Sequence, residues 1–352
     1  MFYNLTVKNV TRETSDTVSV SFDIPNNLKE IFEYTQGQYL TFKKDINGED
    51  VRRSYSLSSS PVSDNDLTVA IKQIEGGKFS TYANQDLKVG DVLETMAPTG
   101  GFFTQLQKNQ TKHYVFFAAG SGITPIISII KTILATEENS TCTLFYGNKS
   151  ADSTIYKAQL DNLASENSSR FSLNYLMSRE NGASEALTGK ISAAKCEALS
   201  SIDSNLYGAN EYFLCGPESM IFDVSDHLKA KGINKDKIHF ELFTAPVKKS
   251  DKPAPLDNVT AQVKVIMDDE EFEFELSSKG NYILDAAMDA GADVPFSCKG
   301  AVCCTCKAKV VEGSARMDMN YALSDEEVEE GYILSCQARP TSEVLVVDYD
   351  VV

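Results

Sequence analysis

The chain has 352 residues, more than one ordinary hydrophobic core holds, so we expect three domains. Hydrophobic residues make up 42% and charged residues 24%, which excludes a disordered or fibrous protein and indicates a globular one. The formal net charge of −17 argues against nucleic acid or an anionic membrane as a partner. No stretch has the ~20 consecutive apolar residues of a membrane span, and the first residues lack the features of a signal peptide, so we expect a cytoplasmic protein.

Residues 1–108 alternate apolar and polar positions in short runs, for example TVSVSFDIP (17–25) and LTVAIKQI (67–74). Alternation with a period of two is typical of strands that bury one face, and the residues between the runs are turn formers. The dipeptide Asn47-Gly48 in particular predicts a two-residue hairpin. We therefore expect an antiparallel β-barrel in this part of the chain.

Two short motifs of this predicted barrel suit a flavin. RRSYSLSSSP contains Arg53, Tyr55 and Ser56, and GGKFS places Gly77 and Ser80 just after a strand. An arginine binds phosphate, a tyrosine ring stacks on a planar heterocycle, and a glycine turn with a hydroxyl suits a second phosphate. The alternative is that this serine-rich strand is a solvent-exposed edge.

Residues 109–243 change to continuous apolar runs that alternate with helical segments, such as HYVFFAAG (113–120) followed by PIISIIKTILAT (125–136). Buried strands separated by helices predict an α/β domain whose parallel sheet is covered on both faces.

Two glycine turns of this α/β segment favour a bound nucleotide. In AAGSGITPI, Gly120 and Gly122 permit close approach of the backbone to a pyrophosphate, and Pro125 suits the first helical position. This G-x-G-x-x-P pattern alone is weak. CGPES adds Cys215 and Gly216 at the carboxyl end of another strand, where ligands bind open α/β sheets.

Residues 244–258 are rich in Pro, Lys and Asp and predict a linker. The last segment, 259–352, starts with a predicted hairpin in VTAQVKVIMDDEEFEFEL and a short helix around ILDAAMDAG. Its 19 acidic residues against 7 basic ones make it a separate acidic domain. Ser324 and Glu327 match a capping box, so we expect a helix to begin there.

Four of the eight cysteines lie within SCKGAVCCTCKAKV (297–310). They include a C-x4-C-x2-C pattern, which with one more distant cysteine is the spacing of plant-type [2Fe–2S] ferredoxins. Each iron needs two thiolates, and the small residues Gly300 and Ala301 let the loop wrap a cluster while its amides donate to sulfur. The predicted ligands are Cys298, Cys303, Cys306 and Cys336.

A structural zinc site is the alternative for these cysteines, but zinc modules usually present two C-x2-C-like pairs, so we favour iron–sulfur. Cys304 is left over, and its side chain should point away from the cluster. Cys142 and Cys196 are expected to be buried as small hydrophobic residues. The three histidines, at positions 113, 227 and 239, are scattered and expected to be structural.

Taken in this order, the motifs resemble a ferredoxin–NADP reductase type module fused to a C-terminal plant-type ferredoxin. The resemblance covers essentially the whole chain, and the stretches IEGGKFSTYA, AAGSGITP, LFYGN and ALSDEEVEEGYILSCQARP are similar to reductase subunits of phenylacetyl-CoA epoxidases. It implies a flavin β-barrel, an α/β nucleotide domain and a β-grasp α+β ferredoxin domain. It also implies electron transfer from NAD(P)H through FAD and a [2Fe–2S] cluster to a di-iron oxygenase that binds the acidic domain.

The resemblance also implies roles for single residues. At the flavin, Arg53 binds the diphosphate, Tyr55 covers the isoalloxazine, and Ser56 and Ser80 complete the FAD site. At the nicotinamide nucleotide, the implied residues are Gly120, Thr124 and Cys215, with Cys215 near the hydride path. Phe243, which closes HFELF, matches an aromatic residue that covers the flavin.

The choice between NADPH and NADH depends on a few charged residues after two predicted strands. Ser178 and Arg179 in MSRE resemble the family's contact to the 2′-phosphate, and Lys149 follows the preceding strand. An Arg–phosphate pair favours NADPH. Asp152 could instead accept a hydrogen bond from a ribose 2′-hydroxyl, as in NADH enzymes. We expect NADPH, with NADH as the alternative.

Other acceptors fit the same three domains, namely a Rieske oxygenase, a steroid hydroxylase or a hybrid-cluster protein. A hypothesis from a different class is a zinc-stabilised interaction module that keeps a nucleotide fold without its activity.

Overall fold

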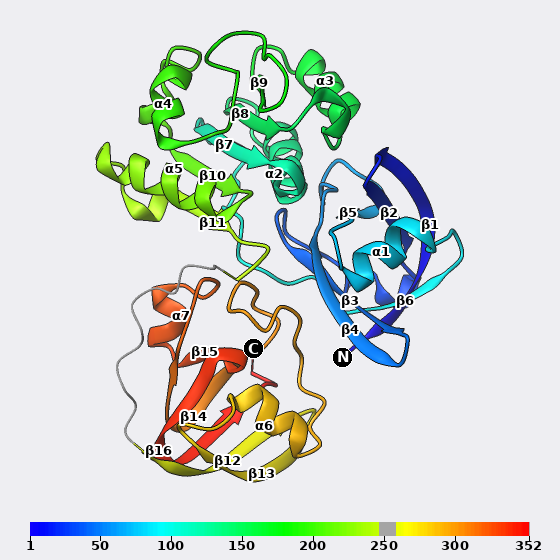
Figure 1. Ribbon diagram of the computed structural model, residues 1–352, viewed down its shortest axis with the longest axis vertical. Helices are drawn as coiled ribbons and strands as arrows, with labels where there is room; N and C mark the ends of the chain where they lie inside the picture. The colour runs from blue at the N-terminus through cyan, green and yellow to red at the C-terminus, as the bar shows by residue number, and fades with distance from the viewer. Residues whose placement is uncertain (246–257, 352) are drawn as a thin grey trace. The chain divides into compact units, whose positions relative to one another are not determined.

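The computed structural model describes residues 1–245 and 258–351 (Figure 1). Phe2–Leu242 form one compact unit and Phe243–Val352 form another. Most of the predicted linker lies outside the described residues. In the part of the chain that the structure describes, no helix combines the length and the apolar character needed to cross a membrane.

The first part of the N-terminal unit is an antiparallel sheet of six strands in the order β4-β3-β6-β1-β2-β5. Leu57, directly after β4, forms an antiparallel bridge to Val69 of β5, which brings the two ends of this sheet together. The predicted antiparallel barrel is therefore confirmed. Its strands are β1 (Tyr3–Thr14), β2 (Thr17–Asp23), β3 (Tyr39–Ile46), β4 (Glu49–Ser56), β5 (Leu67–Lys72) and β6 (Val92–Thr95), with helix α1 (Lys78–Gln85) between the last two.

The hairpin between β3 and β4 turns at Asn47 and Gly48, whose φ angles are +59° and +80°. Two successive residues with positive φ make the tight turn whose twist matches the twist of the strands. The hairpin predicted from Asn47-Gly48 is therefore confirmed, and it sets the register that places Tyr55 opposite Leu40.

The second part of the same unit is a fully parallel sheet in the order β11-β10-β7-β8-β9. Figure 1 shows α4 and α5 on one side of this sheet and α2 and α3 on the other, as the alternating pattern predicts. The elements are β7 (His113–Ala119), α2 (Ile123–Thr136), β8 (Thr141–Asn148), α3 (Lys157–Glu166), β9 (Phe171–Met177), α4 (Ala193–Leu199), β10 (Glu211–Cys215), α5 (Glu218–Ala230) and β11 (Ile238–Glu241).

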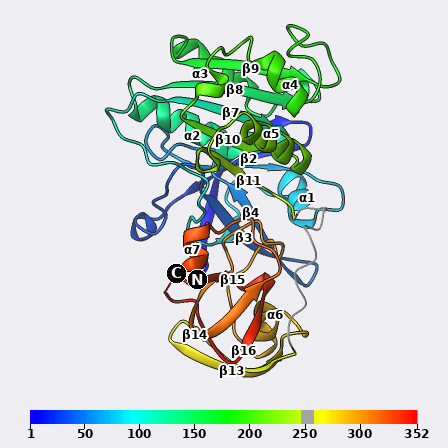
Figure 2. The same ribbon diagram turned by 90° about the vertical axis from the view of Figure 1, so that its left-hand side faces the viewer.

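Strand order reverses between β7 and β10, because β8 and β9 extend the sheet on one side of β7 while β10 and β11 extend it on the other (Figure 2). Loops that leave the carboxyl ends of two such strands go to opposite faces of the sheet and leave a crevice between them. The two glycine turns predicted from the sequence follow these two strands.

The C-terminal unit is a mixed sheet in the order β13-β12-β16-β14-β15, in which only the β12–β16 pair is parallel. The predicted hairpin, the helix and the capping box of Ser324 and Glu327 are all present, so the expected β-grasp α+β domain is confirmed. Its elements are β12 (Thr260–Met267), β13 (Glu270–Ser277), α6 (Ile283–Asp289), β14 (Lys307–Met317), α7 (Asp325–Glu329), β15 (Tyr332–Leu334) and β16 (Ala338–Asp348).

Candidate functional site

The two glycine turns meet at the carboxyl edge of the parallel sheet, where Cys215 pairs in register with Ala118. A β-carbon on Gly122 would lie 2.1 Å from the carbonyl oxygen of Cys215, so this glycine is required for the packing of the two strand ends. Gly120 has a φ of +54°, and a β-carbon there would meet no atom within 4 Å. The open backbone for ligand approach is therefore at Gly120.

Helix α2 begins directly after a short 3-10 turn, Gly120–Gly122. Pro125 is the third residue of this helix, whereas we expected it at the first helical position. The position still lies in the first turn, where most backbone N–H groups have no helical partner, so proline costs no hydrogen bond there. Thr124 is buried, and its hydroxyl donates to the carbonyl oxygen of Ser121 at 3.0 Å.

Three side chains from distant parts of the sequence converge at this edge. Ser56, at the end of β4, donates from Oγ to Oε2 of Glu241 at 2.9 Å. Glu241 ends β11 and pairs in register with Cys215 of β10. A strand end of the barrel and two strand ends of the parallel sheet are thereby joined.

Burial shifts the pKa values of two side chains at this edge, those of Cys215 on β10 and Glu241 on β11. It raises the pKa of the Cys215 thiol well above its usual value, and the nearby Glu241 carboxyl adds to this effect. Burial also raises the pKa of Glu241 to about 7, against the opposing hydrogen bond from Ser56. Glu241 can therefore take up or release a proton near neutral pH, whereas Cys215 stays a neutral thiol.

The predicted flavin strand β4 presents Arg53 and Tyr55 two residues apart, hence on one face. Arg53 is exposed, and its guanidinium is close enough to oppose the rise that burial causes in the pKa of the Tyr55 phenol. The Tyr55 ring contacts the rings of Phe42 and Phe79, with centroids 6.2 and 5.6 Å away. The alternative of a solvent-exposed edge holds for Arg53 alone, since Ser56 is buried.

The glycine turn before α1 has Gly77 at its end and Ser80 in the first helical turn. A β-carbon on Gly77 would lie 2.4 Å from Oγ of Ser80, so the turn closes only with glycine. Ser80 is buried, and its hydroxyl accepts from the backbone N–H of Ile74 at 3.3 Å.

Ser178 and Arg179 lie directly after β9, beside the end of β8. The backbone N–H of Arg179 donates to the carbonyl oxygen of Lys149 at 2.9 Å, and both of these cations are exposed. Asp152 is exposed in the next turn. Two cations at one sheet edge suit a phosphate, as expected for NADPH.

Two residues at this edge were missed from the sequence. Glu241 stands one position before Leu242 in HFELF, and its partner Ser56 is 185 residues away, so no local pattern indicates it. Asn148, the last residue of LFYGN, is buried with a side-chain nitrogen that has no partner among the described residues.

Phe243, predicted to cover the flavin, is 41% exposed. An exposed phenyl ring is available for stacking on a cofactor, and its role stays a prediction.

The four cysteines predicted as ligands form two pairs in the C-terminal unit. The sulfur atoms of Cys303 and Cys298 are 3.0 Å apart, and Cys306 donates a hydrogen bond to Cys336. No group of three or more His, Cys, Asp or Glu side chains within residues 1–245 and 258–351 is arranged to hold one metal ion. Two thiol pairs match a cluster in which each iron takes two thiolates.

The loop around these pairs favours thiolates. The Cys303 thiol, together with the backbone N–H groups of Gly300 and Val302, lowers the pKa of Cys298 to about 6. The Cys306 thiol and the backbone N–H of Ala301 lower the pKa of Cys336. Ala301 has a φ of +63°, which turns the loop so that its amides converge on sulfur. The donor set and its surroundings therefore fit a [2Fe–2S] cluster.

The remaining cysteines and the histidines have structural contacts. Cys304 donates to the carbonyl oxygen of Ala322 at 3.4 Å, and Cys142 and Cys196 are buried. The three histidine rings have the following partners: His113 contacts Asp203 and Thr141, His227 contacts Tyr207, and His239 contacts Glu211.

Three family models match the chain in the order of these parts. They are an oxidoreductase FAD-binding domain (residues 4–103), an oxidoreductase NAD-binding domain (116–226) and a 2Fe-2S iron-sulfur cluster binding domain (265–341). The barrel strands from residue 4 onward fall within the first match, most of the parallel sheet within the second, and the four cysteines within the third, whereas β11 lies beyond the second match.

Two curated relatives match nearly the whole chain. The chain is 40% identical over 349 residues to one of the subunits of the 1,2-phenylacetyl-CoA epoxidase of Escherichia coli, covering 99% of this chain and 98% of that protein. It is 33% identical over 357 residues to the ferredoxin reductase component of 3-ketosteroid-9-alpha-monooxygenase of Rhodococcus rhodochrous, covering 98% and 96%. The solved structure of phthalate dioxygenase reductase is similar with a TM-score of 0.60 at 24% identity, covering 99% of this chain and 98% of that one, and shows the same fold.

Proposed function

The chain belongs to the family of oxidoreductases that join a FAD-binding, a NAD-binding and a 2Fe-2S domain, and from this premise we propose that it is the reductase component of a phenylacetyl-CoA epoxidase system. FAD held by the barrel and a [2Fe–2S] cluster held by Cys298, Cys303, Cys306 and Cys336 would supply the conversion of a two-electron hydride donor, NAD(P)H, into single electrons for the oxygenase.

The observation that carries this proposal is the hydrogen bond of 2.9 Å between Ser56 and Glu241. It brings the strand of the flavin candidates Arg53 and Tyr55 to the sheet edge that holds Cys215 and the open backbone at Gly120. Two ring systems can react only when held at contact distance in a fixed orientation, and this junction supports the proposal because it brings candidate residues of both sites to one edge.

The side chains then have separate tasks. Arg53 neutralises the flavin diphosphate, Tyr55 packs on the isoalloxazine, and Gly77 and Ser80 form the tight turn at the start of α1 that receives the pyrophosphate. Thr124 and Gly216 shape the turns that receive the nicotinamide nucleotide. Cys215 provides a neutral, buried contact for the nicotinamide. The hydrogen-bonded pair of Ser56 and Glu241 holds a proton where the flavin site meets the carboxyl edge of the parallel sheet.

The nucleotide is NADPH in this proposal. Arg179, Ser178 and Lys149 lie together at the β8–β9 edge, where a 2′-phosphate would find two cations and a hydroxyl.

The acceptor is an oxygenase that binds the acidic C-terminal unit. That unit carries a net charge of −12 over residues 259–352, so the complementary surface on the oxygenase is basic, and association slows as salt screens the attraction. We place the protein in the cytoplasm, since cysteine ligands need a reducing compartment before they receive metal.

The test uses purified protein with its visible spectrum and cofactor content. We expect one FAD and two irons per chain, and reduction by NADPH followed by electron delivery to the oxygenase component of phenylacetyl-CoA epoxidase. Delivery to a Rieske oxygenase or a steroid hydroxylase, and not to that component, would replace the acceptor and keep the electron-transfer function. A colourless protein that contains zinc would refute the proposal.

A further inference from the structure

The segment Ser58–Ser60 follows β4 in the chain, beyond the proposed flavin residues, and is buried, with 3%, 2% and 0% of its residues' surfaces exposed. Serines in a buried position need partners for their hydroxyl groups. Within the barrel, Ser59 receives hydrogen bonds at Oγ from the Tyr34 hydroxyl at 2.7 Å and from the Thr68 backbone N–H at 3.0 Å. We call residues 58–60 the serine segment.

The other partners of the serine segment come from helix α2, which starts at the glycine turn of the parallel sheet. Ser128 donates from Oγ to the carbonyl oxygen of Ser59 at 2.6 Å. The hydroxyl groups of Thr132 and Ser60 are hydrogen-bonded at 3.0 Å. One face of α2 is thereby bound to the end of the barrel strand.

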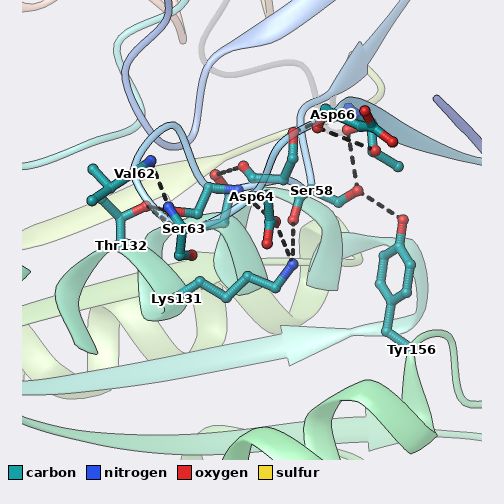
Figure 3. A network of polar contacts seen from close by, with 12 residues as sticks. Ser58, Val62, Ser63, Asp64, Asp66, Lys131, Thr132 and Tyr156 are labelled. Carbon is teal, nitrogen blue, oxygen red and sulfur yellow. Dashed lines mark hydrogen bonds and ion pairs between the residues drawn. The ribbon is translucent and has the colours of Figure 1, made fainter. Parts of the chain in front are cut away.

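Two further side chains of the α/β part complete this junction, as Figure 3 shows. Tyr156 shares a hydrogen bond of 2.7 Å between its hydroxyl and Oγ of Ser58. Lys131 binds Oδ2 of Asp64 at 2.7 Å and lies 3.5 Å from the carbonyl oxygen of Ser58. The Asp64 carboxylate in turn accepts the backbone N–H of Ser60 at 2.9 Å.

The arrangement is costly to build, which indicates that it does more than fill space. The Lys131 side chain is only 9% exposed, and a buried ammonium is tolerated only with a charged partner. Tyr156 has a φ of +60°, a left-handed conformation that a tyrosine rarely adopts, and this conformation accompanies the contact of its hydroxyl with Ser58.

The network connects the two proposed binding sites by short lengths of chain. Ser58 is two residues after Ser56, at the end of the flavin strand, and Ser128 is one helical turn after Thr124, at the nucleotide turn. A shift of α2 against the serine segment would therefore change the separation of the two rings. Directional hydrogen bonds allow one register, whereas an apolar contact allows sliding.

We propose that Lys131, Thr132 and Tyr156 are positioning residues, which hold the nucleotide sheet at the one distance from the flavin barrel at which hydride transfer is fast. The inference rests on the proposed function for the identity of the reaction. A misplacement of about 1 Å costs roughly 100-fold in rate when reacting atoms must meet at contact distance, so small losses in this network have large kinetic effects.

The test compares Tyr156→Phe and Thr132→Val, alone and combined, and Lys131→Met, with the parent holoprotein. Each change removes polar contacts and nearly preserves the volume of the side chain. The volume matters because a cavity of about 370 Å³ already lies beside Lys131 and Asp64, and a much smaller side chain there would enlarge it. Tyr175→Phe and Lys157→Met are matched controls, since these side chains bind Asp161 within the α/β part alone.

Two measurements are made on each variant. Hydrogen exchange of the backbone N–H groups of residues 58–60 and 62–64 reports the junction itself. Rapid-mixing absorbance reports the limiting rate of flavin reduction and the NADPH dissociation constant. We expect faster exchange and a limiting rate reduced about 10-fold or more in the network variants, with FAD content and the dissociation constant within about twofold. Lys131→Arg, which keeps the positive charge, should keep most of the limiting rate of flavin reduction that Lys131→Met loses.

Unchanged limiting rates in the double variant, or equal losses in the two controls, would overturn the inference. A variant that loses FAD, or only binds NADPH more weakly, would also count against positioning. If the parent itself is not reduced by NADPH or NADH, the proposed function fails, and the exchange measurement still reports whether the network holds the serine segment.

Discussion

Ser56 of the barrel donates a hydrogen bond to Glu241 of the parallel sheet, and burial raises the pKa of that carboxyl to about 7. These residues lie 185 positions apart, so only the folded chain makes them partners.

The pH dependence of flavin reduction should follow Glu241. Because its pKa is about 7 in the folded protein, the carboxyl is mostly protonated at pH 6 and mostly ionised at pH 8. We expect the reduction rate with NADPH to change through an inflection near pH 7, and Glu241→Gln to give a flat profile. An inflection that remains in Glu241→Gln would assign it to another group.

Folding stability should respond to the same carboxyl with a definite sign. The pKa rises from about 4.5 in the unfolded chain to about 7 in the fold, so the stabilisation is complete below pH 4.5 and is lost as pH rises through 7. Glu241→Gln should therefore raise the thermal unfolding temperature more at pH 8 than at pH 5.5. Ser56→Ala is the matched control, because it removes the hydroxyl and leaves the titrating group.

Arg53→Ala should weaken FAD binding about 10- to 100-fold, since one charge-assisted contact to phosphate is worth roughly 1.5–3 kcal/mol. The cysteine pairs lie in the other compact unit, so iron content should not change. FAD released on gel filtration, with iron assayed in parallel, measures both. Arg179→Ala is a control of the same residue type, and equal FAD content in Arg53→Ala and the parent would contradict the assignment.

Arg179→Ala should change nucleotide preference rather than overall activity. If its guanidinium binds the 2′-phosphate, kcat/KM for NADPH should fall about 10- to 100-fold and that for NADH should change less than about threefold. The ratio of the two values is the measurement. An equal fall for both nucleotides would place Arg179 outside the 2′-phosphate site.

The adjacent residues Cys303 and Cys304 should behave in opposite ways. Cys303 is paired with Cys298, whereas Cys304 binds the carbonyl oxygen of Ala322. Cys303→Ser should lose the visible absorbance and the iron of the cluster, and Cys304→Ser should keep both. Bleaching in Cys304→Ser would show that the ligand register is wrong by one residue.

Local structure was predictable wherever the determining residues are neighbours in sequence. Asn47-Gly48 specified its hairpin because the turn needs two residues of positive φ, and Ser324 with Glu327 specified a helix start because both partners of a capping box lie within one turn. The cysteine spacing was readable for the same reason, since three of the four predicted ligands share one loop.

The role of a residue was harder to predict where the same local sequence pattern fits two different structural roles. Gly122 fits the approach of a phosphate in sequence, but in the structure its missing β-carbon makes room for the carbonyl oxygen of Cys215. The serine-rich stretch that contains Ser56 suits a solvent-exposed edge in sequence, but Ser58–Ser60 are buried, with partners on α2. Neither role can be predicted without knowing which element packs against the residue, β10 for Gly122 and α2 for the serines.

The sequence by itself determined the three kinds of domain, the order of their motifs and the cysteine spacing, because periodicity, turn chemistry and ligand spacing are properties of short segments. Only the tertiary structure decided that Glu241 lies against Ser56 and that Lys131 is bound to Asp64. Burial and Coulomb interactions depend on distance in space, and the pKa near 7 and the paired buried ammonium exist only after strands and helices far apart in the chain have packed together.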